Sequence, residues 1–88
     1  DVTESQRAEI LRFVHRRWMN EDPLALKAAG RKFIEEVPKE FAYMTRQHAK
    51  MLQQEWFKDG IIANEKMPGK ANLNGIRVIS SELAQTRF

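Results

Sequence analysis

Two histidines are the side chains of this 88-residue protein best suited to acid–base chemistry or to metal binding. His15 and His48 fall in separate helical segments, and neither has the His-x-x-x-His or His-Glu-x-x-His spacing that places two ligands on one helix face. The sequence contains no cysteine, which excludes disulfides, thiolate zinc sites and cysteine nucleophiles. We therefore expect no metal and no cofactor.

Carboxylates and hydroxyls are equally scattered. Glu21-Asp22 and Glu35-Glu36 are adjacent pairs, and neighbours on a helix point about 100° apart, so they do not converge on one reacting atom. The serines and threonines lie in no nucleophile elbow. The segment 67–70, Met-Pro-Gly-Lys, lacks the spacing of a phosphate-binding loop. The sequence thus predicts a protein that is not an enzyme.

Positive charge is concentrated in the second half of the chain. Residues 1–38 carry seven basic and seven acidic groups, whereas residues 39–88 carry eight and five, so the whole net charge of +3 lies beyond residue 38. Such a basic stripe could contact phosphates, and the alternative is an ordinary solvated face interrupted by acidic residues. The candidate phosphate contacts are Arg46, Lys50, Lys58, Lys66, Lys70 and Arg77.

Apolar periodicity predicts the elements that position these groups. A threonine–glutamine capping box opens a helix over 4–19. An aspartate cap and Pro23 start a second helix over 23–36, and Pro38 marks its end. A third helix then covers 39–58 and stops before Gly60.

Beyond residue 60 the pattern changes to short β-prone runs, Ile61-Ile62 and 76–79, separated by turn signals. They predict either a two-stranded hairpin or an extended arm, followed by a final helical turn that begins at 80–82. The predicted fold is mainly α, a three-helix bundle with a C-terminal arm or short β-hairpin. It forms one domain, with a core in 1–60 and an arm in 61–88.

Large aromatic and methionine side chains exceed what three short helices can bury. Trp56 and Phe57 are adjacent and point to different sides of their helix, so we expect one of them to be exposed or covered. Either the arm folds back over this surplus or a protein partner binds it. The candidate partner contacts are Trp18, Phe41, Met44, His48, Met51, Trp56 and Phe57.

Residues 24–63 resemble the theta subunit of bacterial DNA polymerase III and its phage homologue, which are small three-helix proteins. The resemblance is carried by Ala28-Ala29-Gly30-x-x-Phe33-x-Glu35, by Val37-Pro38 before a helix, by Leu52 ahead of Trp56-Phe57, and by Ile62-Ala63. Gly60 stands where the third helix of that family continues. The resemblance implies a non-catalytic subunit that docks on a proofreading exonuclease and stabilises it.

Three functions remain open from the sequence. The leading hypothesis is a small helical accessory subunit that binds and stabilises a larger protein, in DNA replication or in phage or plasmid biology. The first alternative is a small basic DNA-binding protein that uses helix 39–58 and a C-terminal wing. The second is a structural subunit of a larger assembly. No apolar run is long enough to span a membrane, so we expect a cytoplasmic protein with no membrane association.

Overall fold

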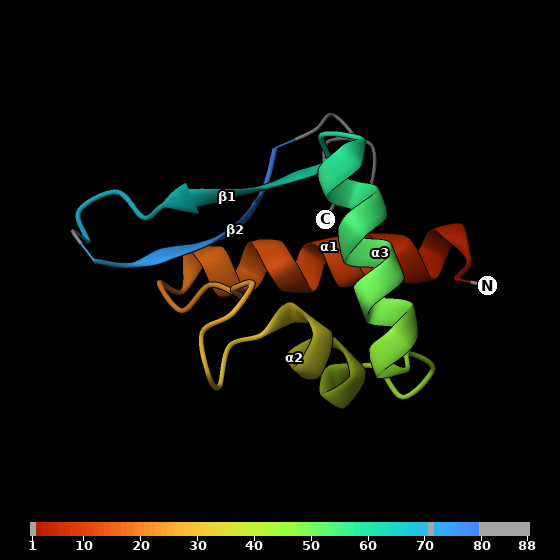
Figure 1. Ribbon diagram of the computed structural model, residues 1–88. Coiled ribbons are helices and arrows are strands. Elements are labelled where there is room, and N and C mark those ends of the chain that lie inside the picture. The colour runs from red at the N-terminus through yellow and green to blue at the C-terminus, as the bar shows by residue number, and fades with distance from the viewer. Residues whose placement is uncertain (1, 71, 80–88) are drawn as a thin grey trace.

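The computed structural model describes residues 2–70 and 72–79, and these form three helices followed by a two-stranded sheet (Figure 1). The helices are α1 (Glu4–Met19), α2 (Phe33–Glu40) and α3 (Arg46–Lys58), and the strands are β1 (Ile62–Lys66) and β2 (Asn74–Val78). The predicted mainly α class with a C-terminal hairpin is therefore confirmed. The predicted helical turn at 80–82 lies outside the described residues.

The first helix has the predicted bounds. The Thr3 side chain accepts a hydrogen bond from the Gln6 amide, and the Gln6 side chain accepts one from the Thr3 amide. This capping box satisfies two amides that a helix start otherwise leaves free. The buried stripe of α1 consists of Ile10, Leu11, Phe13 and Val14.

Residues 20–32 form a loop, so the prediction of a helix over 23–36 is wrong. Leu24 is fully buried, and its carbonyl accepts a 2.7 Å hydrogen bond from the Ile76 amide of β2. Ala25 and Lys32 form an isolated parallel bridge, and Gly30 turns the chain between them with φ +80°. The segment at Leu24 therefore lies beside β2. The hydrogen bond from Ile76 satisfies the buried Leu24 carbonyl, as a bond within a helix would.

The helix boundary predicted at Pro38 is also wrong, because this proline lies inside α2. Phe33 and Val37 are one turn apart and fully buried, and this burial holds the helix together across the proline. The predicted helix over 39–58 begins only at Arg46. The Thr45 side chain caps α3 by accepting a 3.1 Å hydrogen bond from the His48 amide.

After α3 the chain reverses at Gly60, whose φ of +74° agrees with the predicted left-handed terminator. β1 and β2 then pair antiparallel, from Ile62 opposite Val78 to Lys66 opposite Asn74. The hairpin projects beyond the helices on the side away from the N-terminus (Figure 1). Of the two predicted alternatives, a hairpin or an extended arm, the structure shows the hairpin.

A single core joins the helices and the hairpin. Phe33 meets Trp56 edge to face, with ring centroids 6.3 Å apart, and Phe13 meets Phe41 at 5.6 Å. Ile76 and other apolar residues of the hairpin belong to the same buried cluster, so the hairpin completes the core of residues 1–60. Such edge-to-face pairs add to the stabilisation that burial gives.

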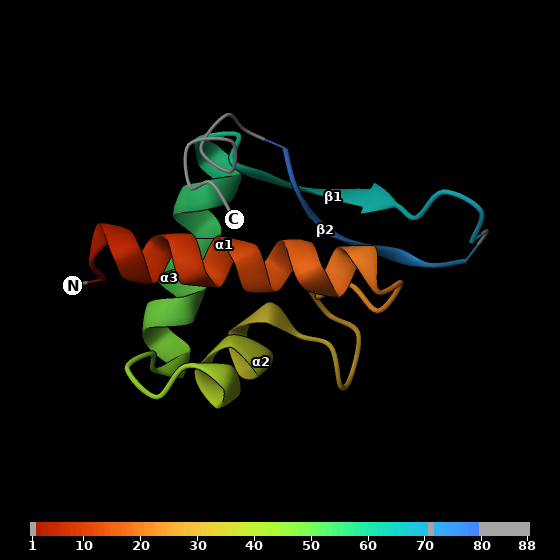
Figure 2. The same ribbon diagram turned by 180° about the vertical axis from the view of Figure 1, so that it is seen from behind.

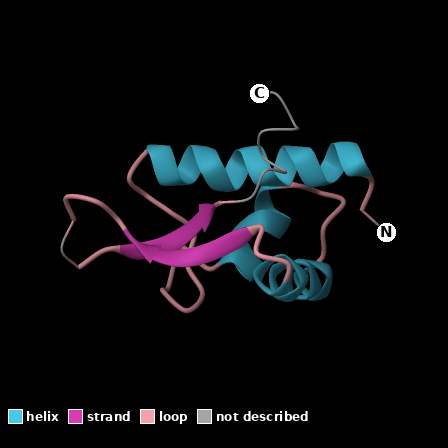
Figure 3. Ribbon diagram, turned by 90° about the horizontal axis from the view of Figure 1, so that it is seen from above, coloured by secondary structure: helices cyan, strands magenta, loops and turns pink. Residues whose placement is uncertain are grey.

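The helices cross one another in space. Seen from either side, α3 runs across α1 rather than along it (Figures 1 and 2). Seen from above, α1 lies on one side of the molecule, and α2, α3 and the hairpin lie on the other (Figure 3). Within 2–70 and 72–79, no helix has the length and apolar character that a membrane crossing requires.

Candidate nucleic-acid interface

The outward face of α3 is largely polar, and one carboxylate, that of Glu55, is exposed at its edge beside the hollow described below. Ala49, Leu52 and Trp56 point into the core. The opposite side of this helix, which we call the outward face, is exposed to solvent and consists of Gln47, Lys50, Met51, Gln54 and Lys58. Because these five residues recur at intervals of three and four, they form one strip along the helix.

A tight turn positions this face. The Phe41 amide donates to the Val37 carbonyl at 2.9 Å, and the Met44 amide donates to the Phe41 carbonyl at 3.0 Å. Met44 is buried in the core beneath the turn. With the Thr45 cap, these contacts fix the start of α3 relative to α2, and the two helices form a helix-turn-helix unit.

The structure divides the six predicted phosphate contacts into two groups. Lys50 and Lys58 lie on the outward face of α3, and Arg46 lies at its start with Nη1 3.8 Å from Glu35 Oε2. The others belong to the hairpin and its connecting loop. One stripe therefore does not join all six cations, since the far end of the hairpin and the start of α3 lie apart (Figure 1).

The cations of the hairpin and its connecting loop differ in whether a carboxylate pairs with them. Arg77 Nη1 lies 2.8 Å from Glu65 Oε1 across the two strands, and Lys70 Nζ lies 4.0 Å from Glu21 Oε2. Lys66 is exposed, and no carboxylate among the described residues pairs with it. An arginine already paired with a carboxylate contributes less to phosphate binding than an unpaired lysine at the same place.

Two predicted partner contacts are buried and offer no surface. Trp56 is fully buried against Phe33, with the Arg7 guanidinium carbon 5.9 Å from its ring, and Met44 is only 4% exposed. For these two residues the prediction of a surplus that three helices cannot bury is wrong. Apolar residues of the loop and of the hairpin enlarge the core that buries them. Trp18, Phe41 and Phe57 are half-buried, whereas His48 and Met51 are exposed.

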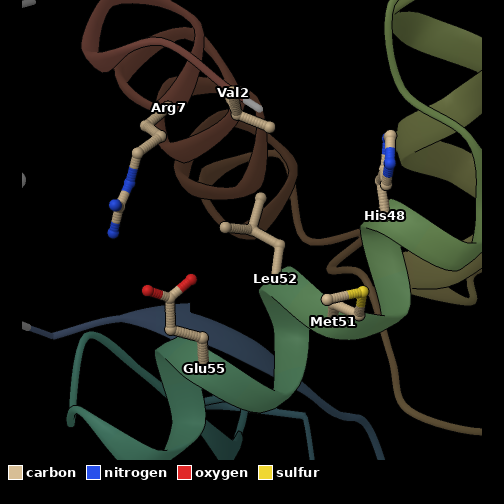
Figure 4. Close-up of a pocket in the computed structure, with 6 residues that line it drawn as sticks. All are labelled: Val2, Arg7, His48, Met51, Leu52 and Glu55. Atoms are coloured by element: carbon tan, nitrogen blue, oxygen red, sulfur yellow. The ribbon is translucent and has the colours of Figure 1, made fainter.

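Beside the outward face, a hollow of about 340 Å³ lies between the start of α1 and α3. Val2 and Leu52 form its apolar part, while the Arg7 and Glu55 side chains extend into it from opposite helices (Figure 4). His48 and Met51 of α3 complete its lining. This mixed lining has both signs of charge and a small apolar area, which suits no single ligand class.

The described residues contain no group of three or more histidine, aspartate or glutamate side chains that could hold a metal ion. No polar or charged residue among them is buried. Burial raises the pKa of Tyr43 above its usual value, and the nearby charge of Glu9 raises it further. The Tyr43 hydroxyl donates a 3.4 Å hydrogen bond to the Gln6 carbonyl, and this tyrosine stays protonated at neutral pH.

Sequence reasoning missed the two glutamines of the outward face. Gln47 and Gln54 are seven residues apart, so they lie on one side of any helix that contains both. The sequence shows this spacing, but neither the charged residues nor the aromatic residues indicate it.

Comparison with protein-family models, with curated proteins and with solved structures finds no match to this chain.

Proposed function

We propose that this chain binds double-stranded DNA with α3 in the major groove and the hairpin as a wing on the adjacent backbone. One observation carries the proposal: a helix-turn-helix unit whose second helix exposes two lysines and two glutamines on one face is followed directly by a β-hairpin. The order of a helix, an extended segment at Leu24, two helices and a hairpin is that of winged helix-turn-helix domains. This is an analogy of fold, and the surface chemistry supports it independently.

The number of unpaired lysines on this surface sets how strongly the DNA-binding constant should depend on salt concentration. Lys50, Lys58 and Lys66 are exposed and pair with no carboxylate among the residues the structure describes. Three phosphate contacts give a slope of about −2.7 for the logarithm of the binding constant against the logarithm of salt concentration. Raising the salt from about 50 mM to about 200 mM should then weaken binding about 40-fold.

The test is a fluorescence-anisotropy titration of a labelled DNA duplex with the full chain at several salt concentrations. Lys50→Ala and Lys58→Ala should each weaken binding and reduce the slope by about 0.9. Arg16→Ala is the control, because Arg16 is an exposed cation of α1 whose Nη2 lies 4.0 Å from Glu40 Oε2, and α1 lies on the opposite side of the molecule from α3 (Figure 3). Binding that does not respond to salt, or that both lysine variants retain unchanged, refutes the proposal.

A second candidate function is docking on a larger protein, as the resemblance to a polymerase accessory subunit implies. Met51, with 59% of its surface exposed at the edge of the hollow between α1 and α3, favours it. The substitution Met51→Glu should abolish capture of a partner that survives nuclease treatment, while Met19→Glu, on an equally exposed methionine, should not. Equal capture by both variants contradicts this function.

A further inference from the structure

Gln47 and Gln54 are the outermost polar groups of α3 that carry no charge. Both are exposed on the outward face, and among the described residues no side chain forms a hydrogen bond or ion pair with either. A glutamine amide presents one donor and one acceptor side by side. In the major groove this pair matches adenine, which offers an N7 acceptor next to an N6 donor.

The spacing of the two amides agrees with the spacing of base pairs. Seven residues correspond to a rise of about 10.5 Å along a helix. Base pairs are stacked about 3.4 Å apart along the DNA axis, and a helix lying in the groove is inclined to that axis, so the two amides lie no more than about three base pairs apart. The α-helix itself has a diameter of about 10–12 Å, which fits a major groove about 12 Å wide.

Met51 lies between the two glutamines on the same face and is one of the most exposed apolar side chains of the described chain. An exposed thioether next to amides gains little from water but packs well against a methyl group. The C5-methyl of thymine is the apolar group that the major groove presents, and only A·T pairs carry it. The amides and the methionine therefore favour the same kind of base pair.

We propose that α3 recognises A·T base pairs, with Gln47 and Gln54 each bonding an adenine and the adenines no more than about three base pairs apart, while Met51 contacts a thymine methyl between them. This inference rests on the proposed function, because it assumes that α3 enters the major groove. It adds to that function the sequence that the domain selects. The lysines of the same face bind phosphates and carry no sequence information.

The experiment begins with selection of duplexes from a randomised DNA pool by the full chain. The parent protein should enrich sites that contain two A·T pairs at this spacing. On the best site, Gln47→Ala and Gln54→Ala should each weaken binding about 5- to 150-fold and remove the preference at one position. Both variants should keep the parent's affinity for unrelated DNA, because the phosphate contacts are unchanged.

Gln53→Ala is the control, because Gln53 lies on the same helix but is partly buried on the side away from the outward face. Modified duplexes test the contacts without changing the protein. Replacing each selected adenine by 7-deazaadenine removes the N7 acceptor and should weaken the parent but not the corresponding glutamine variant. Replacing thymine by uracil removes the methyl group and should weaken the parent but not Met51→Ala.

The outcomes separate the two proposals. Duplex binding without base preference, or a preference that survives both glutamine substitutions, overturns the adenine inference and leaves the proposed function standing. Absence of salt-dependent duplex binding by the folded parent overturns the proposed function and the inference with it. Loss of the preference in Gln47→Ala and Gln54→Ala, with Gln53→Ala unaffected, supports both.

Discussion

Gly75 is the position where the structure leaves least room for an added methyl group. A Cβ built on Gly75 would overlap with Cβ and Cγ of Pro23 and would lie 3.0 Å from the Leu24 carbonyl oxygen. The Pro23 ring is rigid and fully buried, and the Leu24 carbonyl is bound to the Ile76 amide at 2.7 Å. Gly75→Ala should therefore push the loop at 23–25 away from β2.

The expected loss of unfolding free energy in Gly75→Ala follows from two opposing effects. Overpacking of a filled core costs about 1–3 kcal/mol, and alanine recovers about 0.4–1 kcal/mol by restricting the unfolded chain. The net loss is about 1–2 kcal/mol of unfolding free energy, out of about 4–13 kcal/mol expected for a domain of this length. For a domain of this size the melting temperature should fall by roughly 4–16 °C.

The assay is thermal and urea denaturation, followed by circular dichroism, of Gly75→Ala, Pro23→Gly and the double variant. Because Pro23→Gly removes the ring that the new methyl meets, Gly75→Ala should cost much less in that background. Gly69→Ala is the control: nothing lies within 4 Å of its added Cβ, so its cost should be the same with or without the proline. A coupling between positions 23 and 75 below about 0.5 kcal/mol would refute the reasoning.

Three further predictions concern the core, the cap of α3 and the raised pKa of Tyr43. Trp56→Ala should lower the unfolding free energy by about 3–5 kcal/mol because Trp56 is fully buried, while Met51→Ala should change it by less than about 0.5 kcal/mol; equal urea midpoints would contradict this. Thr45→Ala should cost about 1 kcal/mol through loss of the α3 cap, and Thr45→Asp should restore it in the same assay; a midpoint unchanged by alanine argues against the cap. The folded state raises the pKa of Tyr43, so its contribution to stability is complete below the unfolded pKa of about 10 and is lost as pH rises through the folded pKa. Glu9→Gln should lower this pKa in an ultraviolet titration, and a pKa that does not move would show that Glu9 exerts no effect.

Local signals predicted the elements that local interactions determine. The capping box alone set the start of α1, and the turn signals with β-prone runs indicated the hairpin. Gly60 ended α3 as expected, because a left-handed residue there requires no partner elsewhere in the chain.

The elements that distant contacts determine were not predictable in this way. Ala28 and Ala29 favour a helix by composition, yet the segment forms a turn, in which the Leu24 carbonyl accepts a hydrogen bond from the Ile76 amide and Arg31 donates one to the Pro23 carbonyl at 3.2 Å. Burial of Leu24 and its hydrogen bond to a residue so far along the chain override local helix propensity. Nothing in the spacing of the apolar residues indicates it.

The candidate interface was predicted in part. The prediction includes the cations of helix 39–58 and a wing. The predicted helix begins seven residues too early, because Thr45 caps α3 and the helix starts at Arg46. With the helix extended back to residue 39, the turn at Phe41 disappears, and the outward face cannot be assigned to a helix-turn-helix unit. Trp56 is a predicted partner contact, but it is fully buried against Phe33 of α2 and belongs to the core cluster.

The bond between Leu24 and Ile76 also bears on how the chain folds. It links positions 24 and 76, and the Arg31 guanidinium reaches the Asn74 carbonyl, at 3.5 Å, across 43 positions of sequence. Contacts so distant in sequence form slowly, because a long loop must close first. The unit of α2 and α3 can assemble from local contacts, whereas the loop at 20–32 must await β2. During synthesis β2 emerges from the ribosome after the three helices, and the core they form is completed only when it pairs with β1.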